Sequence, residues 1–242
     1  MRSIYYKIAP GIIVLALLPG VAAAEKLLVG DAAAVVRSVE GIYESDIRTL
    51  KRADEVFFTE VIATKEDSAS KIRFADDTLL TIGPASKVAI DAFVYDPNGK
   101  NSKMVVNATL GVARFVTGKM GSAAYQIKTP TATIGVRGTI LTVSVEEDGT
   151  TSTVVEDGAV FVQGEAGEPV EVGEGLATTT APGEEPTEPA PPTGDTETEV
   201  AEMDVTLLLD GGEQGGNDSV TEEGLTEIVE EVEQMRAAGC GC

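Results

Sequence analysis

The chain has 242 residues, with 40 acidic and 18 basic side chains and no histidine, which gives a formal net charge of −22. This balance provides no basic patch to neutralise phosphates, so nucleic acid and anionic membrane surfaces are poor partners, whereas cations and basic protein surfaces remain suitable. The lack of histidine excludes Ser-His-Asp and Cys-His catalysis and histidine-based zinc sites. The sequence contains no phosphate-binding loop, dinucleotide fingerprint or nucleophile elbow, so we expect no enzymatic activity and no cofactor.

Residues 1–24 have the pattern of a secretory signal. Arg2 and Lys7 precede an apolar run from Ile8 to Leu18, and the segment ends in three alanines. The run is shorter than the roughly 20 residues that span a bilayer. We interpret the segment as a signal cleaved after Ala24, with an uncleaved anchor as the alternative. Cleavage predicts export to the periplasm or the outer cell envelope.

Residues 25–181 have the pattern of one all-β domain. Short β-branched runs alternate with Gly, Asp, Asn and Pro, and no amphipathic helix is indicated. Asp-Gly pairs at 148–149 and 157–158 predict two of the turns. A chain of this kind hides its sheet edges by rolling into a sandwich, barrel or coil. The expected strands are Ala32–Val39, Glu55–Thr64, Ser70–Ala75, Thr78–Ile82, Lys87–Asp91, Lys103–Ala108, Val112–Thr117, Ile140–Glu146, Ser152–Glu156, Ala159–Gln163 and Pro169–Val172.

Five motifs in this region point to a known family. They are "FADDTLLTIGPAS" at 74–86, "FVYDP" at 93–97, "GVARFVTG" at 111–118, "TPTATIGVRGT" at 129–139 and "EDG" at 156–158. Together they closely resemble the FecR domain, a periplasmic β-domain, over roughly Val35 to Thr180. The resemblance implies a single rolled β-sandwich or β-roll-like fold. One departure is Asp77, where the family has glycine, so the first hairpin must turn without one.

Arg137 has two interpretations. It could grip a carboxylate of a partner with its bidentate fork, or it could hold the fold by donating to backbone carbonyls or to an acid such as Asp91 or Asp96. The flanking glycines suit a close strand approach or a bulge, which favours the structural role. We expect the same role for the other motif residues. These are Asp76, Gly83, Pro84, Tyr95, Asp96, Pro97, Gly111, Arg114, Phe115, Thr129, Pro130, Gly135, Gly138, Thr139 and Gly158.

Residues 182–218 are expected to form a disordered acidic linker, rich in Pro, Glu, Thr and Gly and poor in large apolar residues. Between Glu184 and Met235 the sequence has 17 acidic residues and no Lys or Arg, so most of the excess negative charge lies there. The segment "DGGEQGGND" at 210–218 loosely resembles calcium-binding turns, and so does the loop from Asp96 to Lys103. The first is one imperfect copy and the second contains Lys100, so we favour acidic linker or loop over a metal site.

Residues 219–238 regain a helical period and predict a short amphipathic helix, with Ser219 and Glu222 at capping-box spacing. Such a helix is marginal alone and becomes plausible when it docks on a partner or on its own domain. Residues 239–242 hold both cysteines, 240 and 242, which could pair with each other, pair with another chain, or belong to a disordered end. The apolar stripe of the helix is Leu225, Ile228, Val229, Val232 and Met235.

These features predict a non-catalytic periplasmic or cell-envelope protein that acts as a protein-interaction or signalling module. The regulators that gave the FecR family its name carry a sigma-factor-binding segment and one transmembrane helix before the β-domain. Few residues precede the apolar run here, so we expect this chain to lack that segment and to bind another envelope protein. The alternative is a structural or adhesive surface protein whose acidic tail binds divalent cations.

Overall fold

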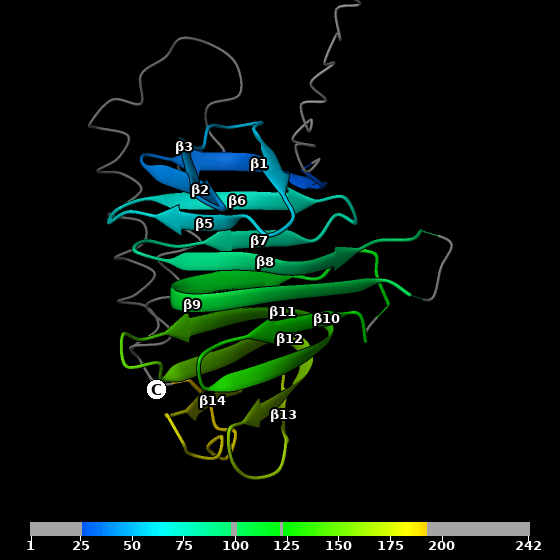
Figure 1. Ribbon diagram of the computed structural model, residues 1–242. Helices are drawn as coiled ribbons and strands as arrows, with labels where there is room; N and C mark the ends of the chain where they lie inside the picture. Colours follow the sequence, from blue (N-terminus) through cyan, green and yellow to red (C-terminus); the bar gives the residue numbers. More distant parts are fainter. Residues whose placement is uncertain (1–25, 98–100, 122, 193–242) are drawn as a thin grey trace, which may run out of the picture.

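The computed structural model describes residues 26–97, 101–121 and 123–192 (Figure 1). Within these ranges the secondary structure is β throughout, with fourteen strands and no helix, which confirms the all-β prediction. The strands are β1 (Leu28–Val36), β2 (Val39–Tyr43), β3 (Asp46–Thr49), β4 (Glu55–Phe57), β5 (Val61–Thr64), β6 (Ala69–Phe74), β7 (Leu79–Ile82), β8 (Lys87–Val94), β9 (Lys103–Val116), β10 (Tyr125–Lys128), β11 (Ala132–Val145), β12 (Thr151–Gly164), β13 (Val170–Gly173) and β14 (Ala177–Thr180).

The strands stack along one axis, from β1 at one end to β13 and β14 at the other (Figure 1). Their pairing forms two layers. One layer has the order β4-β1-β6-β7-β9-β11-β12-β14, and the other has the order β3-β2-β5-β8-β9-β10-β11-β12-β13. The strands β9, β11 and β12 occur in both layers because each is 14 residues long and bends from one layer into the other.

Each long strand bends at a glycine with a positive φ. In β9, Leu110 still pairs with β8, whereas Gly111 (φ 80°) begins the pairing with β11. Gly138 (φ 62°) and Gly158 (φ 87°) occupy the same kind of position in β11 and β12, where the register between the two strands also shifts. Left-handed backbone of this kind favours glycine. The motif glycines therefore form the corners of the fold.

This geometry corrects four of the predicted strands. The expected pairs Lys103–Ala108 with Val112–Thr117, and Ser152–Glu156 with Ala159–Gln163, are each one continuous strand. The predicted turn at Asp157-Gly158 is wrong, because Gly158 makes a bulged corner inside β12 and the chain does not reverse there. The predicted turn at Asp148-Gly149 does connect β11 to β12.

The N-terminal half differs from the prediction in a second way. The single strand expected at Glu55–Thr64 is two strands, β4 and β5, which lie in different layers and are separated by a turn at Thr59 (φ 64°). The β2–β3 hairpin and the short strands β10 and β14 were not predicted. Each of these four strands has only four or five residues, too few to show a clear alternating pattern.

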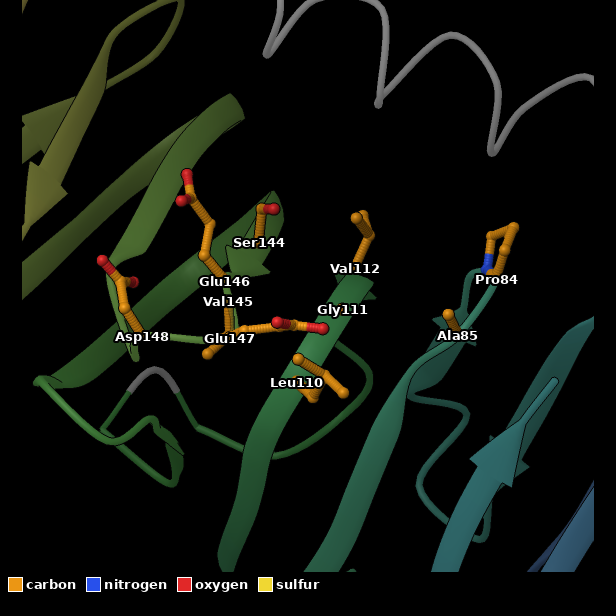
Figure 2. A pocket seen from close by; sticks show the side chains of 10 residues that line it. All are labelled: Pro84, Ala85, Leu110, Gly111, Val112, Ser144, Val145, Glu146, Glu147 and Asp148. Atoms are coloured by element: carbon orange, nitrogen blue, oxygen red, sulfur yellow. The ribbon is translucent and has the colours of Figure 1, made fainter. Parts of the chain in front are cut away.

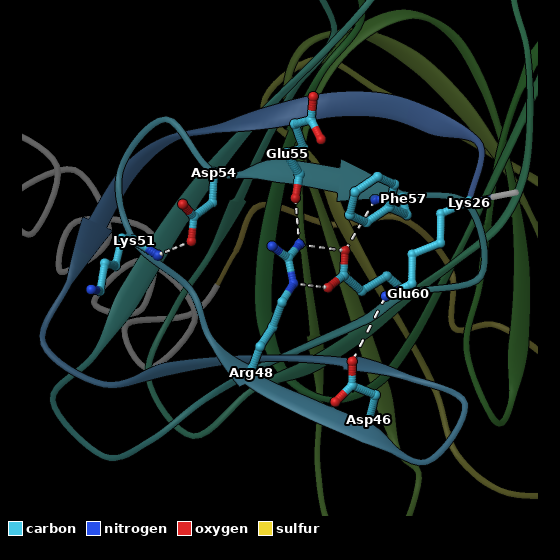
Figure 3. Close-up of polar contacts among 8 residues, drawn as sticks. All are labelled: Lys26, Asp46, Arg48, Lys51, Asp54, Glu55, Phe57 and Glu60. Carbon is cyan, nitrogen blue, oxygen red and sulfur yellow. Dashed lines mark hydrogen bonds and ion pairs between the residues drawn. The ribbon is translucent and has the colours of Figure 1, made fainter.

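An ion pair closes the N-terminal end of the sandwich (Figure 3). Glu60 is fully buried, and its carboxylate accepts hydrogen bonds from Nε of Arg48 at 2.9 Å and Nη2 of Arg48 at 3.0 Å. The backbone N–H of Phe57 donates a third at 3.0 Å, and Arg48 also donates to the carbonyl of Glu55. The hydrogen bond that Arg48 donates to Glu60 raises the pKa of Arg48. The network thus links β3 in one layer to β4 in the other.

Residues 182–190 close the opposite end. They fold back along β14, where Ala190 and Ala177 exchange two backbone hydrogen bonds of 3.0 and 2.8 Å. The hydroxyl of Thr178 donates to the carbonyl of Thr187 at 2.7 Å, and Pro186 is buried. The fold therefore continues past the boundary predicted at residue 181. The remainder of the predicted linker, from 193 to 218, lies outside the described residues.

Deleting this closing segment is expected to destabilise the domain. A chain from Glu25 to Ala181 should lose about 2 kcal/mol of unfolding free energy relative to a chain ending at Pro192, because the hydrogen bonds of the segment, worth about 1 kcal/mol each, and the burial of Pro186 together exceed the cost of ordering it. Urea denaturation measures the difference. Equal midpoints for the two chains would show that the segment adds nothing to the fold.

Candidate protein-binding surface

Most motif residues serve the fold, and Asp76 shows how. Its side chain is fully buried, and Oδ2 accepts hydrogen bonds from the hydroxyls of Thr78 at 2.6 Å and Tyr125 at 2.8 Å. The N–H of Thr78 donates to Oδ1 at 3.2 Å. Asp77 then takes a left-handed φ of 65°, so the hairpin does turn without glycine, as predicted. The exposed ion pair with Lys119 lowers the pKa of Asp77.

Tyr125 makes this network sensitive to alkaline pH. Burial raises its pKa to about 12, so the native state holds the phenol proton more tightly than the unfolded chain does. Its stabilising effect is fully present below pH 10 and is lost as the pH rises toward 12, by at most about 3 kcal/mol. We expect unfolding free energy to fall over this window. Tyr125→Phe should remove that part of the slope, which urea titrations across the window would measure.

Arg114 also has a structural role. On the outer surface of β9 it donates to both oxygens of Glu156 on β12, with Nη2 to Oε2 at 2.7 Å and Nε to Oε1 at 2.9 Å. The hydroxyl of Thr142, on the intervening strand β11, donates to the same carboxylate at 3.1 Å. This cluster ties three neighbouring strands together across one layer.

The other motif residues lie in turns, at corners or in the core. Phe115 and Thr139 are buried, and the Thr139 hydroxyl donates to the carbonyl of Ala159 at 2.8 Å. Tyr95 is half-buried beside the core, whereas Asp96 and Pro97 are exposed after β8. Gly83 and Pro84 form the turn between β7 and β8, and Thr129 and Pro130 form the turn between β10 and β11.

Arg137 does not have the structural role expected for it. Its side chain is exposed, and it forms no hydrogen bond or ion pair with any described residue, so the predicted contact with Asp91 or Asp96 is absent. The physical reason is the direction in which the Arg137 side chain points. Val136 faces the core, so Arg137 faces outward at the corner that Gly138 makes.

Arg137 borders a hollow of about 420 Å³ on the outer surface of the layer that contains β10 and β13. Gly135 leaves this position without a side chain, and Phe161, its cross-strand partner on β12, stands beside it with 42% of its surface exposed. Ala123, Tyr125 and Val136 complete the lining. The sequence motifs include Gly135 and Arg137 but not Phe161, which lies beyond the motif at 156–158.

Two lysines lie on the same surface. Lys103 on β9 and Lys128 on β10 point outward with Arg137 and Phe161, since their neighbours along each strand face the core. Neither lysine forms an ion pair with another residue of the described ranges. We call this group the cationic face and define it as Lys103, Lys128, Gly135, Arg137 and Phe161. Asp91 on β8 and Glu171 on β13 lie at its two sides.

A second, wider hollow of about 640 Å³ has the opposite charge (Figure 2). The β11–β12 turn contributes Glu146, Glu147 and Asp148, and Pro84 and Ala85 of the β7–β8 turn stand across from them. Asp148 is already engaged, because its carboxylate accepts the N–H of Thr150 at 2.8 Å, and that bond lowers its pKa. The described ranges contain no group of three or more potential metal ligands.

The remaining predicted positions lie outside the described residues. They are the signal cleavage position at Ala24 and the helix stripe of Leu225, Ile228, Val229, Val232 and Met235. Among the residues that are described, none belongs to a helix long and apolar enough to cross a membrane.

Comparison with known proteins agrees with the motifs. Residues 60–161 match the family model described as FecR protein. Two crystal structures of a "putative anti-sigma factor" from Parabacteroides distasonis ATCC 8503, at 1.65 and 2.50 Å resolution, align with TM-scores of 0.45 and 0.46 at 15% identity. The alignment covers 57% of this chain and 62% of the other, so this chain spans less than two thirds of that protein. None of the curated proteins matches it.

Proposed function

We propose that this chain, whose residues 60–161 match the FecR family model, is a non-catalytic module of the cell envelope that binds another protein, in signalling or in regulation. It acts after export. The alternative is a surface protein whose acidic tail, which lies outside the described residues, binds divalent cations.

One observation carries this proposal: the cationic face is exposed and unpaired in a domain whose other arginines are largely engaged. Arg48, Arg73 and Arg114 each form an ion pair with a carboxylate, whereas Arg137 forms none within the described ranges. An arginine beside an exposed aromatic ring is the composition of an interface hot spot. Arg137 can grip a carboxylate bidentately while Phe161 packs on an apolar side chain of the partner.

Substitutions on the face test the proposal. We expect Arg137→Glu or Phe161→Ser to weaken partner binding about 30-fold, the effect of losing a hot spot of about 2 kcal/mol. The fold should be unaffected, because both side chains are exposed and Arg137 forms no hydrogen bond or ion pair with another described residue. In-cell crosslinking followed by mass spectrometry identifies the partner, and titration of the purified pair gives the affinities.

A matched control distinguishes the loss of the Arg137 contact from a general effect of the changed net charge. Arg52→Glu changes the charge equally on an exposed loop near β3, at the opposite end of the stack, and should leave binding intact. The chain ending at Pro192 distinguishes the face from the tail. Partner capture that survives Arg137→Glu but disappears in the shortened chain would place recognition on the predicted helix at 219–238. Equal capture by all variants would contradict both sites.

A further inference from the structure

The cationic face lies in a strongly acidic chain. Acidic side chains outnumber basic ones by 40 to 18, so a cation on the surface has many carboxylates to pair with. Lys103, Lys128 and Arg137 have no ion-pair partner within the described ranges, and Arg137 borders the hollow beside the exposed ring of Phe161. Their charges therefore favour an acidic occupant that the described residues do not include.

The chain itself contains such an occupant. Residues 193–235 follow the last described residue and carry 14 acidic side chains and no basic ones. The first of them are Asp195, Glu197 and Glu199, and apolar residues such as Val200 and Met203 are interspersed among the acids. The charge and composition of this segment are complementary to the cationic face. Its carboxylates can pair with the three cations, and its apolar side chains can pack against Phe161.

The acidic segment also leaves the domain at a position close to the cationic face. Ala190 pairs with Ala177 beside β14, and β14 pairs with the N-terminal part of β12. The C-terminal part of β12 carries Phe161 in the other layer, and stacked layers lie about 10 Å apart. Ten residues span up to about 33 Å when extended, so the acidic segment begins within reach of the face. Covalent attachment gives it a high effective concentration there.

We propose that the acidic segment 193–235 binds the cationic face of its own domain and covers the Arg137–Phe161 hollow. The contact is electrostatic and reversible, because it forms between exposed charges that salt screens. The inference does not depend on the proposed partner, since the contact lies within one chain.

A spin label on the segment tests this in the full chain. The native cysteines, 240 and 242, are replaced by serine, Thr206→Cys receives the label, and paramagnetic broadening of the amide signals is measured by NMR. We expect signals from β10, β11 and the C-terminal part of β12 to broaden at low ionic strength. The broadening should fall several-fold at about 1 M salt, where the Debye length is about 3 Å.

Two charge-reversal variants make the test specific. Lys103→Glu with Lys128→Glu should abolish the broadening, whereas Lys51→Glu with Arg52→Glu, which changes the net charge equally on the loop before β4, should preserve it. Absence of broadening at low salt would overturn the inference, as would equal loss in the two variants. Broadening that grows with protein concentration would instead identify a second copy as the occupant and would also overturn it.

Discussion

Replacing Arg48 with methionine is expected to lower the free energy of unfolding by about 3–5 kcal/mol, the cost of leaving a buried carboxylate without its ion-pair partner. Glu60 is fully buried, and the guanidinium supplies two of its three hydrogen bonds. After the substitution only the N–H of Phe57 continues to donate to it. The methionine side chain keeps much of the apolar stem of the arginine, so the loss reports mainly on the charge. Urea denaturation at neutral pH measures it.

The exposed pair between Arg73 and Asp31 provides the matched control. Its side chains are 54% and 36% exposed, so Arg73→Met should cost less than about 1 kcal/mol. Combining Arg48→Met with Glu60→Leu should restore much of the stability, because replacing both buried charges with apolar groups removes the unpaired carboxylate. If Arg48→Met costs no more than Arg73→Met, the ion pair does not stabilise this end of the sandwich.

The sequence predicted the class of the fold well because the class depends on local patterns. Alternating β-branched runs identified β6 and β7 almost at their observed bounds and the first five residues of β8. The motif resemblance implied the family whose model the comparison then matched. It could not show that β9, β11 and β12 are continuous. A glycine between two alternating runs is equally consistent with a turn and with a corner inside one strand, and only the pairing of the flanking residues distinguishes them.

The candidate site was predicted in part. The sequence singled out Arg137 but could not show its direction, which depends on which neighbour faces the core. Phe161 and the two lysines carry no motif, and they meet Arg137 only because β9, β10, β11 and β12 lie side by side. Such a surface is a property of strand register, and register follows from pairing that a single sequence does not display.

Gly158→Ala is expected to destabilise the domain by about 3–4 kcal/mol, which is the second large effect. Two causes act at this corner. The φ of 87° is strained for any residue with a Cβ, which costs about 1–2 kcal/mol. In addition, an added methyl group would overlap the carbonyl oxygen of Gly138 and lie 3.2 Å from Cα of Thr139. Both of these atoms belong to the β11 backbone, so relief of the overlap would have to separate two paired strands.

Gly175→Ala separates the backbone strain at positive φ from the overlap with the β11 backbone. Gly175 has a φ of 72°, but an added methyl group there has open space around it, so only the backbone strain of about 1–2 kcal/mol should appear. The difference between the two variants in urea denaturation measures the contact between the β11 and β12 corners. Equal losses would mean that the corners separate at little cost. A larger loss for Gly158→Ala would show that this motif glycine is required for the close approach of two backbones, which explains its place in a fold built from strands that change layer.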